Sequence, residues 1–92
     1  MIRNILDADT ERLWLTGNCR RFASIAKVAL RKLDQIDASV VIEDLKAPPG
    51  NRLEKLKGDR AGQWSIRIND QWRICFRWSD GDAWDVEIVD YH

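Results

Sequence analysis

The chain has 92 residues, which allow one domain with a single modest hydrophobic core over residues 1–92. Its 15 lysine and arginine residues balance its 15 aspartate and glutamate residues, so no global positive field can attract nucleic acid. No apolar run approaches the roughly 20 residues of a membrane span, and no signal-peptide pattern is present. We therefore expect a cytoplasmic protein with no membrane partner. Cys19 and Cys75 lack the spacing of a zinc site or a disulfide framework and should be free thiols.

The N-terminal residues predict a short strand followed by a helix. Residues 1–6 can form an edge strand. Either Asp7 or Asp9 can then cap a helix, because a short carboxylate side chain accepts hydrogen bonds from the first free amide groups. Gly17 is placed to end this helix, since glycine readily adopts the left-handed conformation of a helix terminus.

A longer helix is predicted over residues 22–36, where apolar side chains recur at helical spacing. Its charged residues should face solvent; they are Lys27, Arg31, Lys32 and Asp34. Ser39 can cap one further turn over residues 42–45. The Pro48-Pro49-Gly50 run then breaks the backbone and directs it toward the C-terminal part of the chain.

The C-terminal part predicts an antiparallel sheet. Residues 63–68, 71–78 and 84–92 alternate apolar and polar side chains, which is the period of half-buried strands. The apolar set includes four tryptophans, which we expect in the core rather than on a base-stacking platform. The set is Trp64, Ile66, Ile68, Trp72, Ile74, Phe76, Trp78, Trp84, Val86 and Ile88. Helices followed by strands predict an α+β domain in which two helices cover this face and a basic face lies open opposite.

The register of the strands places the arginines. A loop of residues 69–71 puts Arg67 opposite Arg73, and a loop of residues 79–83 puts Arg77 opposite Asp85. Arg77 then has a cross-strand partner, whereas Arg73 has none and lies diagonal to Tyr91. Either Arg73 leans toward Glu87 or water, or it forms an anion site beside Tyr91.

Two further segments carry candidate chemistry. Residues 51–60 hold more basic than acidic side chains and are the candidate basic patch. The chain ends in Asp90-Tyr91-His92, which can move protons and stack on a base. His92 is the only histidine, and histidine is the side chain that titrates nearest neutral pH.

These segments contain an ordered set of motifs. They are Leu-x-x-Leu-Lys-Gly-Asp-Arg-x-Gly-x-Trp-Ser at residues 53–65, Trp-Arg-Ile-x-Phe at residues 72–76, Gly-Asp-Ala at residues 81–83, and the terminal Asp-Tyr-His. Together they resemble HigB-type toxins of the RelE/ParE superfamily, the plasmid maintenance system killer proteins, and in particular the GraT-like branch. The resemblance spans essentially the whole chain and implies a RelE-like fold.

The resemblance also implies a function. Such a protein is the toxin of a type II toxin-antitoxin system, a ribosome-dependent endoribonuclease that cleaves mRNA in the A site without a metal or other cofactor. Its implied partners are the ribosome, a HigA-like helix-turn-helix antitoxin, and operator DNA bound through the antitoxin complex. Two alternatives remain open: a ParE-like DNA gyrase inhibitor, and a catalytically weak toxin that acts mainly as a co-repressor.

The family positions for chemistry match Lys57, Arg73, Asp90, Tyr91 and His92. Metal-free RNA cleavage needs a base, an acid and positive charge at the phosphate. Lys57 and Arg73 would hold the phosphate, Tyr91 would stack on a base, and His92 would be the principal proton-transfer group. Asp90 would either orient His92 or transfer a proton itself.

One position departs from the family pattern. Many relatives have histidine where this chain has Glu54, so either Glu54 is a second proton-transfer group or it only forms an ion pair with Arg52 or Lys57. Beyond these catalytic candidates, further basic residues are expected to contact the RNA strand. They are Arg52, Lys55, Arg60 and Arg67.

Overall fold

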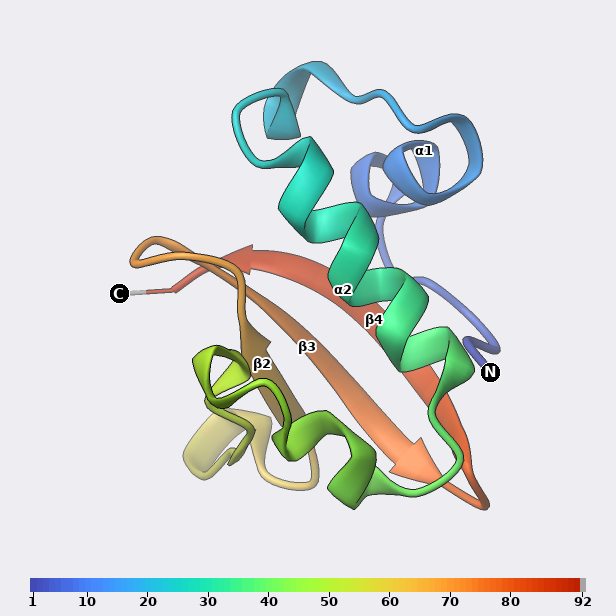
Figure 1. Ribbon diagram of the computed structural model, residues 1–92, viewed down its shortest axis with the longest axis vertical. Coiled ribbons are helices and arrows are strands. Elements are labelled where there is room, and N and C mark those ends of the chain that lie inside the picture. The colour runs from blue at the N-terminus through green and yellow to red at the C-terminus, as the bar shows by residue number, and fades with distance from the viewer. Residues whose placement is uncertain (92) are drawn as a thin grey trace.

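The computed structural model describes residues 1–91, in which two helices pack on one face of a four-stranded antiparallel sheet (Figure 1). The helices are α1 (Ala8–Thr16) and α2 (Ala26–Ala38). The strands are β1 (Glu54–Lys55), β2 (Trp64–Arg67), β3 (Trp72–Ser79) and β4 (Asp82–Asp90), and they neighbour one another in this order. The predicted α+β class is confirmed. No helix in the described part of the chain is both long and apolar enough to cross a bilayer.

Helix α1 begins and ends as its sequence predicts. The Asp7 carboxylate accepts a hydrogen bond from the Thr10 amide at 3.0 Å, which satisfies one of the free donors of the first turn. Gly17 has a φ of 78°, and its amide donates to the Leu13 carbonyl at 2.8 Å. Such a positive φ is the conformation in which glycine closes a helix.

Helix α2 is shorter at its start than predicted, because Phe22 belongs to a separate 3-10 turn (Arg20–Phe22). Ser39 caps the C-terminal end of α2 and does not start the next turn, since its hydroxyl donates to the Gln35 carbonyl at 2.7 Å. The start of the next 3-10 turn (Ile42–Lys46) is capped instead by the Asp44 carboxylate, which accepts hydrogen bonds from the amides of Val40 and Val41. These two bonds lower the pKa of Asp44 below its ordinary value.

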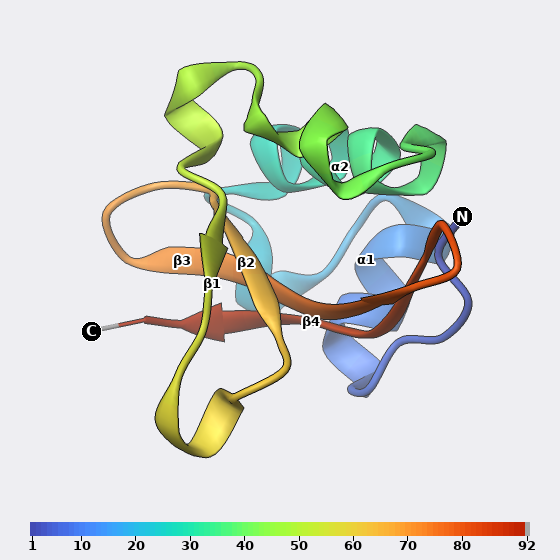
Figure 2. The same cartoon turned by 90° about the horizontal axis from the view of Figure 1, so that it is seen from below.

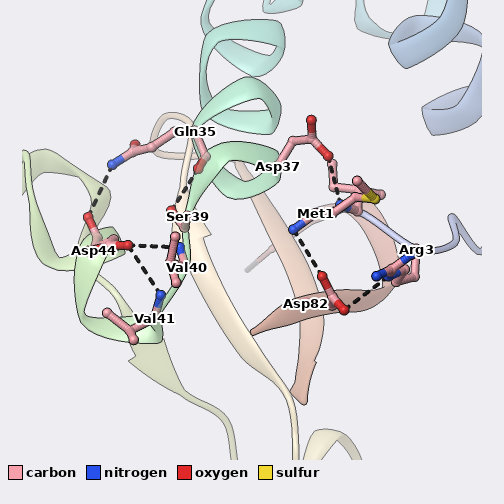
Figure 3. A network of polar contacts seen from close by, with 10 residues as sticks. Met1, Arg3, Gln35, Asp37, Ser39, Val40, Val41, Asp44 and Asp82 are labelled. Carbon is pink, nitrogen blue, oxygen red and sulfur yellow. Dashed lines mark hydrogen bonds and ion pairs between the residues drawn. The ribbon is translucent and has the colours of Figure 1, made fainter. Parts of the chain in front are cut away.

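The N-terminal segment lies beside β4 and is joined to it by isolated parallel bridges at Ile2 and Ile5. Figure 3 shows the polar contacts around it. Arg3 Nε lies 3.0 Å from an oxygen of Asp82, and the Ile2 amide donates to Asp37 of α2 at 2.8 Å. The segment therefore connects the end of α2 to the β3–β4 hairpin.

The predicted register of β2 and β3 is confirmed, with Ile66 opposite Ile74 and Arg67 opposite Arg73. The predicted five-residue loop between β3 and β4 is wrong. Asp80 and Gly81 alone make the turn, with φ values of 53° and 79°. Two positive φ angles define the tight hairpin turn whose twist matches that of the flanking strands.

A bulge compensates for this shorter turn. The register shifts between Cys75 and Arg77, so that Arg77 lies opposite Trp84 and not opposite Asp85. Asp85 has a φ of 53°, and Trp84 consequently points away from the core and is 42 % exposed. The prediction of Trp84 as a core residue is therefore wrong, although the Arg77–Asp85 ion pair still forms at 3.5 Å.

The core lies between the helices and the sheet. Its fully buried side chains come from both layers, and Trp64, Trp72 and Trp78 pack against them as predicted. They include Leu13, Phe22, Leu33, Ile36, Leu45, Ile66, Ile74, Phe76 and Val86.

Lys32 is the exception among the charged residues of α2. It is buried, not solvent-exposed as predicted, and its ammonium donates a short hydrogen bond to Asn51. Burial, reinforced by the charges of Arg31 and Arg67, lowers the pKa of Lys32 below its ordinary value.

Because of the bulge, Trp78 and Trp84 should contribute unequally to the free energy of unfolding. We expect Trp78→Ala to lower the free energy of unfolding by about 2 kcal/mol or more, because Trp78 packs against the core and contacts Phe76 edge to face. Trp84→Ala should cost less than about 1 kcal/mol. Urea denaturation of both variants measures the difference, and equal losses would mean that Trp84 lies in the core after all.

Candidate active site

The face of the sheet opposite the helices carries the candidate site. Figure 2 shows that the C-terminal end of β4 and residues 54–60 lie at the same end of the sheet. Between them is a cavity of about 400 Å³. It is lined by Glu54, Lys55, Leu56, Lys57, Asp59, Arg60 and Tyr91.

The structure therefore gathers most of the predicted site residues. Glu54, Lys57 and Tyr91 share the cavity, and Arg73 adjoins it through contacts to two of them. Within residues 1–91, Lys57 has no ion-pair partner, so its ammonium is free to meet a phosphate. His92, the predicted principal proton-transfer group, lies outside the described residues.

Arg73 is buried, with 8 % of its surface exposed, and is held on several sides. Its Nε donates to the Ser65 hydroxyl at 2.8 Å, and its Nη2 donates to the Arg52 carbonyl at 2.7 Å. The prediction of an arginine without a partner is therefore wrong. These two partners, a serine hydroxyl of β2 and a backbone carbonyl, carry no net charge, so opposite-charge pairing could not predict them.

Two further groups flank the Arg73 guanidinium. A carboxylate oxygen of Glu54 lies 3.6 Å from Nη2, and the guanidinium carbon lies 5.3 Å from the centre of the Tyr91 ring. The ion pair of Glu54 is thus with Arg73, and not with Arg52 or Lys57 as the sequence suggested. The cation–π contact fixes Tyr91 against Arg73 and confirms that the two residues are neighbours.

Arg52 contributes its backbone. It has a φ of 45° and a ψ of 56°, a left-handed conformation that is uncommon outside glycine. In this conformation its carbonyl is directed at Arg73, while its own amide donates to the Pro49 carbonyl at 3.1 Å. The prediction that the Arg52 side chain contacts RNA remains untested.

Arg60 is tied to the sheet. Its Nη1 lies 2.8 Å from a carboxylate oxygen of Glu87 and 3.0 Å from the Gln63 side-chain oxygen. The hydrogen bond to Glu87 raises the pKa of Arg60 above its ordinary value.

Cys75 is fully buried on the same face, and burial raises the pKa of its thiol. A thiol kept in its neutral form is a poor nucleophile.

Gln71 is a site residue that the sequence reasoning missed. Its side chain donates to the Asp90 carboxylate at 3.1 Å, and its carbonyl accepts the Tyr91 amide at 2.7 Å. One loop residue thus positions two candidate catalytic residues. Its position in the loop just before β3, opposite the end of β4, could have indicated this role. Arg67, in contrast, forms an ion pair with Asp70.

The described residues offer acids, cations and an aromatic ring. Residues 1–91 contain no group of three or more His, Cys, Asp or Glu side chains placed to hold a metal ion. The arrangement can bind an anion between Lys57 and Arg73 and support an aromatic base on Tyr91.

The buried contacts of Arg73 predict different stabilities for two arginine variants. Arg73→Ala should lower the free energy of unfolding by about 1–3 kcal/mol, because it leaves the Ser65 hydroxyl and the Arg52 carbonyl without their donor. Arg77→Ala should cost less than about 1 kcal/mol, because its ion pair is largely exposed. Chemical denaturation of the two variants tests this, and a larger loss for Arg77→Ala would contradict it.

The sequence matches a known family over nearly its whole length. The model of the RelE-like toxin of type II toxin-antitoxin system HigB matches residues 7–92. Toxin HigB-1 of Vibrio cholerae is 48 % identical over 61 residues, which are 66 % of this chain and 64 % of the relative. Endoribonuclease HigB of Proteus vulgaris is 41 % identical over 61 residues, which are 66 % of this chain and 65 % of the relative. The aligned part thus spans less than two thirds of the length of these relatives.

Solved structures share the fold at lower sequence identity. A chain of a heterotetrameric YoeB–YefM toxin-antitoxin complex from Staphylococcus aureus aligns over 100 % of this chain and 99 % of that chain, with a TM-score of 0.57 and 18 % identity. The YoeB dimer from the same organism gives a TM-score of 0.55, again with 18 % identity and with 100 % and 99 % of the two chains covered. This similarity shows the RelE-like fold. Because the family model covers residues 7–92, the chain belongs to the HigB family of RelE-like toxins of type II toxin-antitoxin systems.

Proposed function

We propose that this chain is an endoribonuclease toxin and that the cavity beside Arg73 is its active site. The observation that carries the proposal is the Arg73 guanidinium, held by Ser65 and the Arg52 carbonyl at the edge of a cavity that contains Lys57 and Tyr91. The name of the Proteus vulgaris relative, Endoribonuclease HigB, supports the reaction class.

The cations would stabilise the transition state. Within residues 1–91, the hydrogen bonds of Arg73 use Nε and Nη2, so the two N–H groups of Nη1 remain for a phosphate oxygen. Lys57, which follows β1 and lines the cavity, supplies a second positive charge. Because Arg73 is already held in place, little reorganisation is needed when charge develops on the phosphorane.

The chemistry would be a transphosphorylation. The ribose 2′-oxygen forms a bond to the adjacent phosphorus while the bond from phosphorus to the 5′-oxygen breaks. A base accepts the 2′-hydroxyl proton, and an acid gives a proton to the leaving 5′-oxygen. His92, which follows Tyr91 directly in the chain, is proposed as the principal proton-transfer group. Asp90 orients it or acts with it, and Glu54 is the remaining candidate.

The ribosome and an antitoxin complete the proposal. With a formal net charge of zero, the chain lacks a long-range field to hold free RNA, so the ribosomal A site would present the mRNA. A HigA-like helix-turn-helix antitoxin would neutralise the toxin and bind operator DNA with it. The YoeB–YefM complexes of the same fold support an antitoxin as a partner.

Expression of the chain without an antitoxin should stop growth and produce new 5′ ends in translated mRNAs, in phase with codons. Mapping of cellular RNA 5′ ends after induction measures this. The purified protein should cut free RNA poorly. Efficient, salt-insensitive cleavage of free RNA would contradict the role of the ribosome, and DNA breaks linked to gyrase would replace the whole proposal.

Deletion of His92 should reduce cleavage on translating ribosomes by about 10²–10⁴-fold, the usual contribution of a proton-transfer group. Glu54→Gln should have a modest effect, because an ion pair of a half-exposed carboxylate with Arg73 is the role that its position supports. Arg77→Ala serves as the control, and antitoxin binding should stay within a few fold in all three variants. Full activity without His92 would move the proton transfer to Glu54 or Asp90.

A further inference from the structure

Asn51 lies outside the cavity, next in sequence to a residue that contacts Arg73. It is fully buried, although it is a polar residue in a 3-10 turn (Pro49–Asn51) on the protein surface. The residue that follows it is Arg52, whose carbonyl holds Arg73. We propose that Asn51 is a positioning residue for Arg73, an inference that rests on the proposed role of Arg73 at the phosphate.

Both polar groups of the Asn51 side chain have hydrogen-bond partners. Its Nδ2 donates to the Gln35 side-chain oxygen at 3.0 Å and to the carbonyls of Leu45 and Ala47 at 3.2 Å each. Its Oδ1 accepts a short hydrogen bond from the buried ammonium of Lys32. A buried amide with all of its groups satisfied has one permitted orientation, because any rotation leaves polar groups unpaired.

These contacts attach the turn to helix α2. Lys32 and Gln35 are three residues apart and therefore lie on the same face of the helix. Gln35 also donates to the Ala47 carbonyl at 2.6 Å and to the Asp44 carbonyl at 3.4 Å, the latter contact being drawn in Figure 3. The turn before β1 is thus held by a long, well-packed helix and not by its own short backbone.

The fixed turn determines where the Arg52 carbonyl points. The amide of Asn51 donates to the Pro48 carbonyl at 2.9 Å, and the amide of Arg52 donates to the Pro49 carbonyl at 3.1 Å. Arg52 adopts a left-handed conformation, which a non-glycine residue keeps only where the surroundings enforce it. From this conformation its carbonyl accepts Arg73 Nη2 at 2.7 Å. Loss of the Asn51 contacts frees Arg52 to relax and removes this acceptor.

The test compares Asn51→Ala with Thr10→Val. Thr10 is also fully buried, and its replacement also removes a buried hydrogen bond, from the Ile88 amide at 3.1 Å, but it belongs to α1 and contacts β4. Both variants should be destabilised, so both are studied at a temperature where they are fully folded. The structural readout is the ¹⁵N–¹H signal of Arg73 Nε, assigned by its absence in Arg73→Lys. This signal reports the bond to the Ser65 hydroxyl and the neighbouring Tyr91 ring.

Asn51→Ala should shift or broaden the Arg73 signal and reduce single-turnover cleavage on ribosomes roughly ten- to hundredfold, the cost of a small misplacement of a catalytic group. Ribosome binding should stay within a few fold. Thr10→Val should change neither the signal nor the cleavage rate.

An Arg73 signal that is unchanged in folded Asn51→Ala would overturn the proposal, whatever the cleavage rate. If Asn51→Ala does not fold, Gln35→Met removes one partner of Asn51 and should still shift the Arg73 signal, and no shift would again overturn the proposal. If the wild type cleaves no RNA, the proposed function fails, but the Arg73 signal still decides whether Asn51 positions Arg73.

Discussion

The structure depends on how the Arg73 guanidinium is held. A buried positive charge is tolerated only where hydrogen bonds and counter-charges compensate for lost hydration. Four parts of the chain provide this compensation: Ser65 from β2, the Arg52 carbonyl from the preceding turn, the Glu54 carboxylate from β1, and the Tyr91 ring after β4. Strand β1 has only two residues, so its pairing with β2 alone would hold it weakly. Arg73 joins this short strand to the rest of the sheet.

The parts of the fold that the sequence predicted are those governed by neighbouring residues. The caps of α1 follow from Asp7 and Gly17, and the pairing of β2 with β3 follows from the alternation of apolar side chains across a short loop. The pairing of β3 with β4 could not be predicted in this way near its turn, where the register shifts between Cys75 and Arg77. An odd-numbered loop and a two-residue turn with a bulge both keep Ile74 and Ile88 on one face. Only the second solution exposes Trp84, and alternation alone does not distinguish them.

The sequence predicted which residues lie at the candidate site better than it predicted their contacts. Resemblance to the family identified Lys57, Arg73 and Tyr91, and the cavity lies among them. The hydrogen-bond acceptors of Arg73 could not be predicted, because a hydroxyl and a backbone carbonyl leave no pattern of charge in the sequence. Lys32 was misplaced for a related reason. It lies at the border of the apolar stripe of α2, and its burial depends on Asn51, a residue far along the chain.

The exposed Trp84 has a consequence for observing the protein. It lies opposite Arg77, on the same face of the sheet as the candidate site, and among the five tryptophans in residues 1–91 it alone has an exposed side chain. The other four are partly buried and should be less accessible to small quenchers such as acrylamide. The quenchable fraction of the intrinsic fluorescence therefore reports on this end of the face. Any macromolecule that covers Trp84, whether ribosome, antitoxin or a second copy, should protect its fluorescence from the quencher. This protection can be measured without an added label.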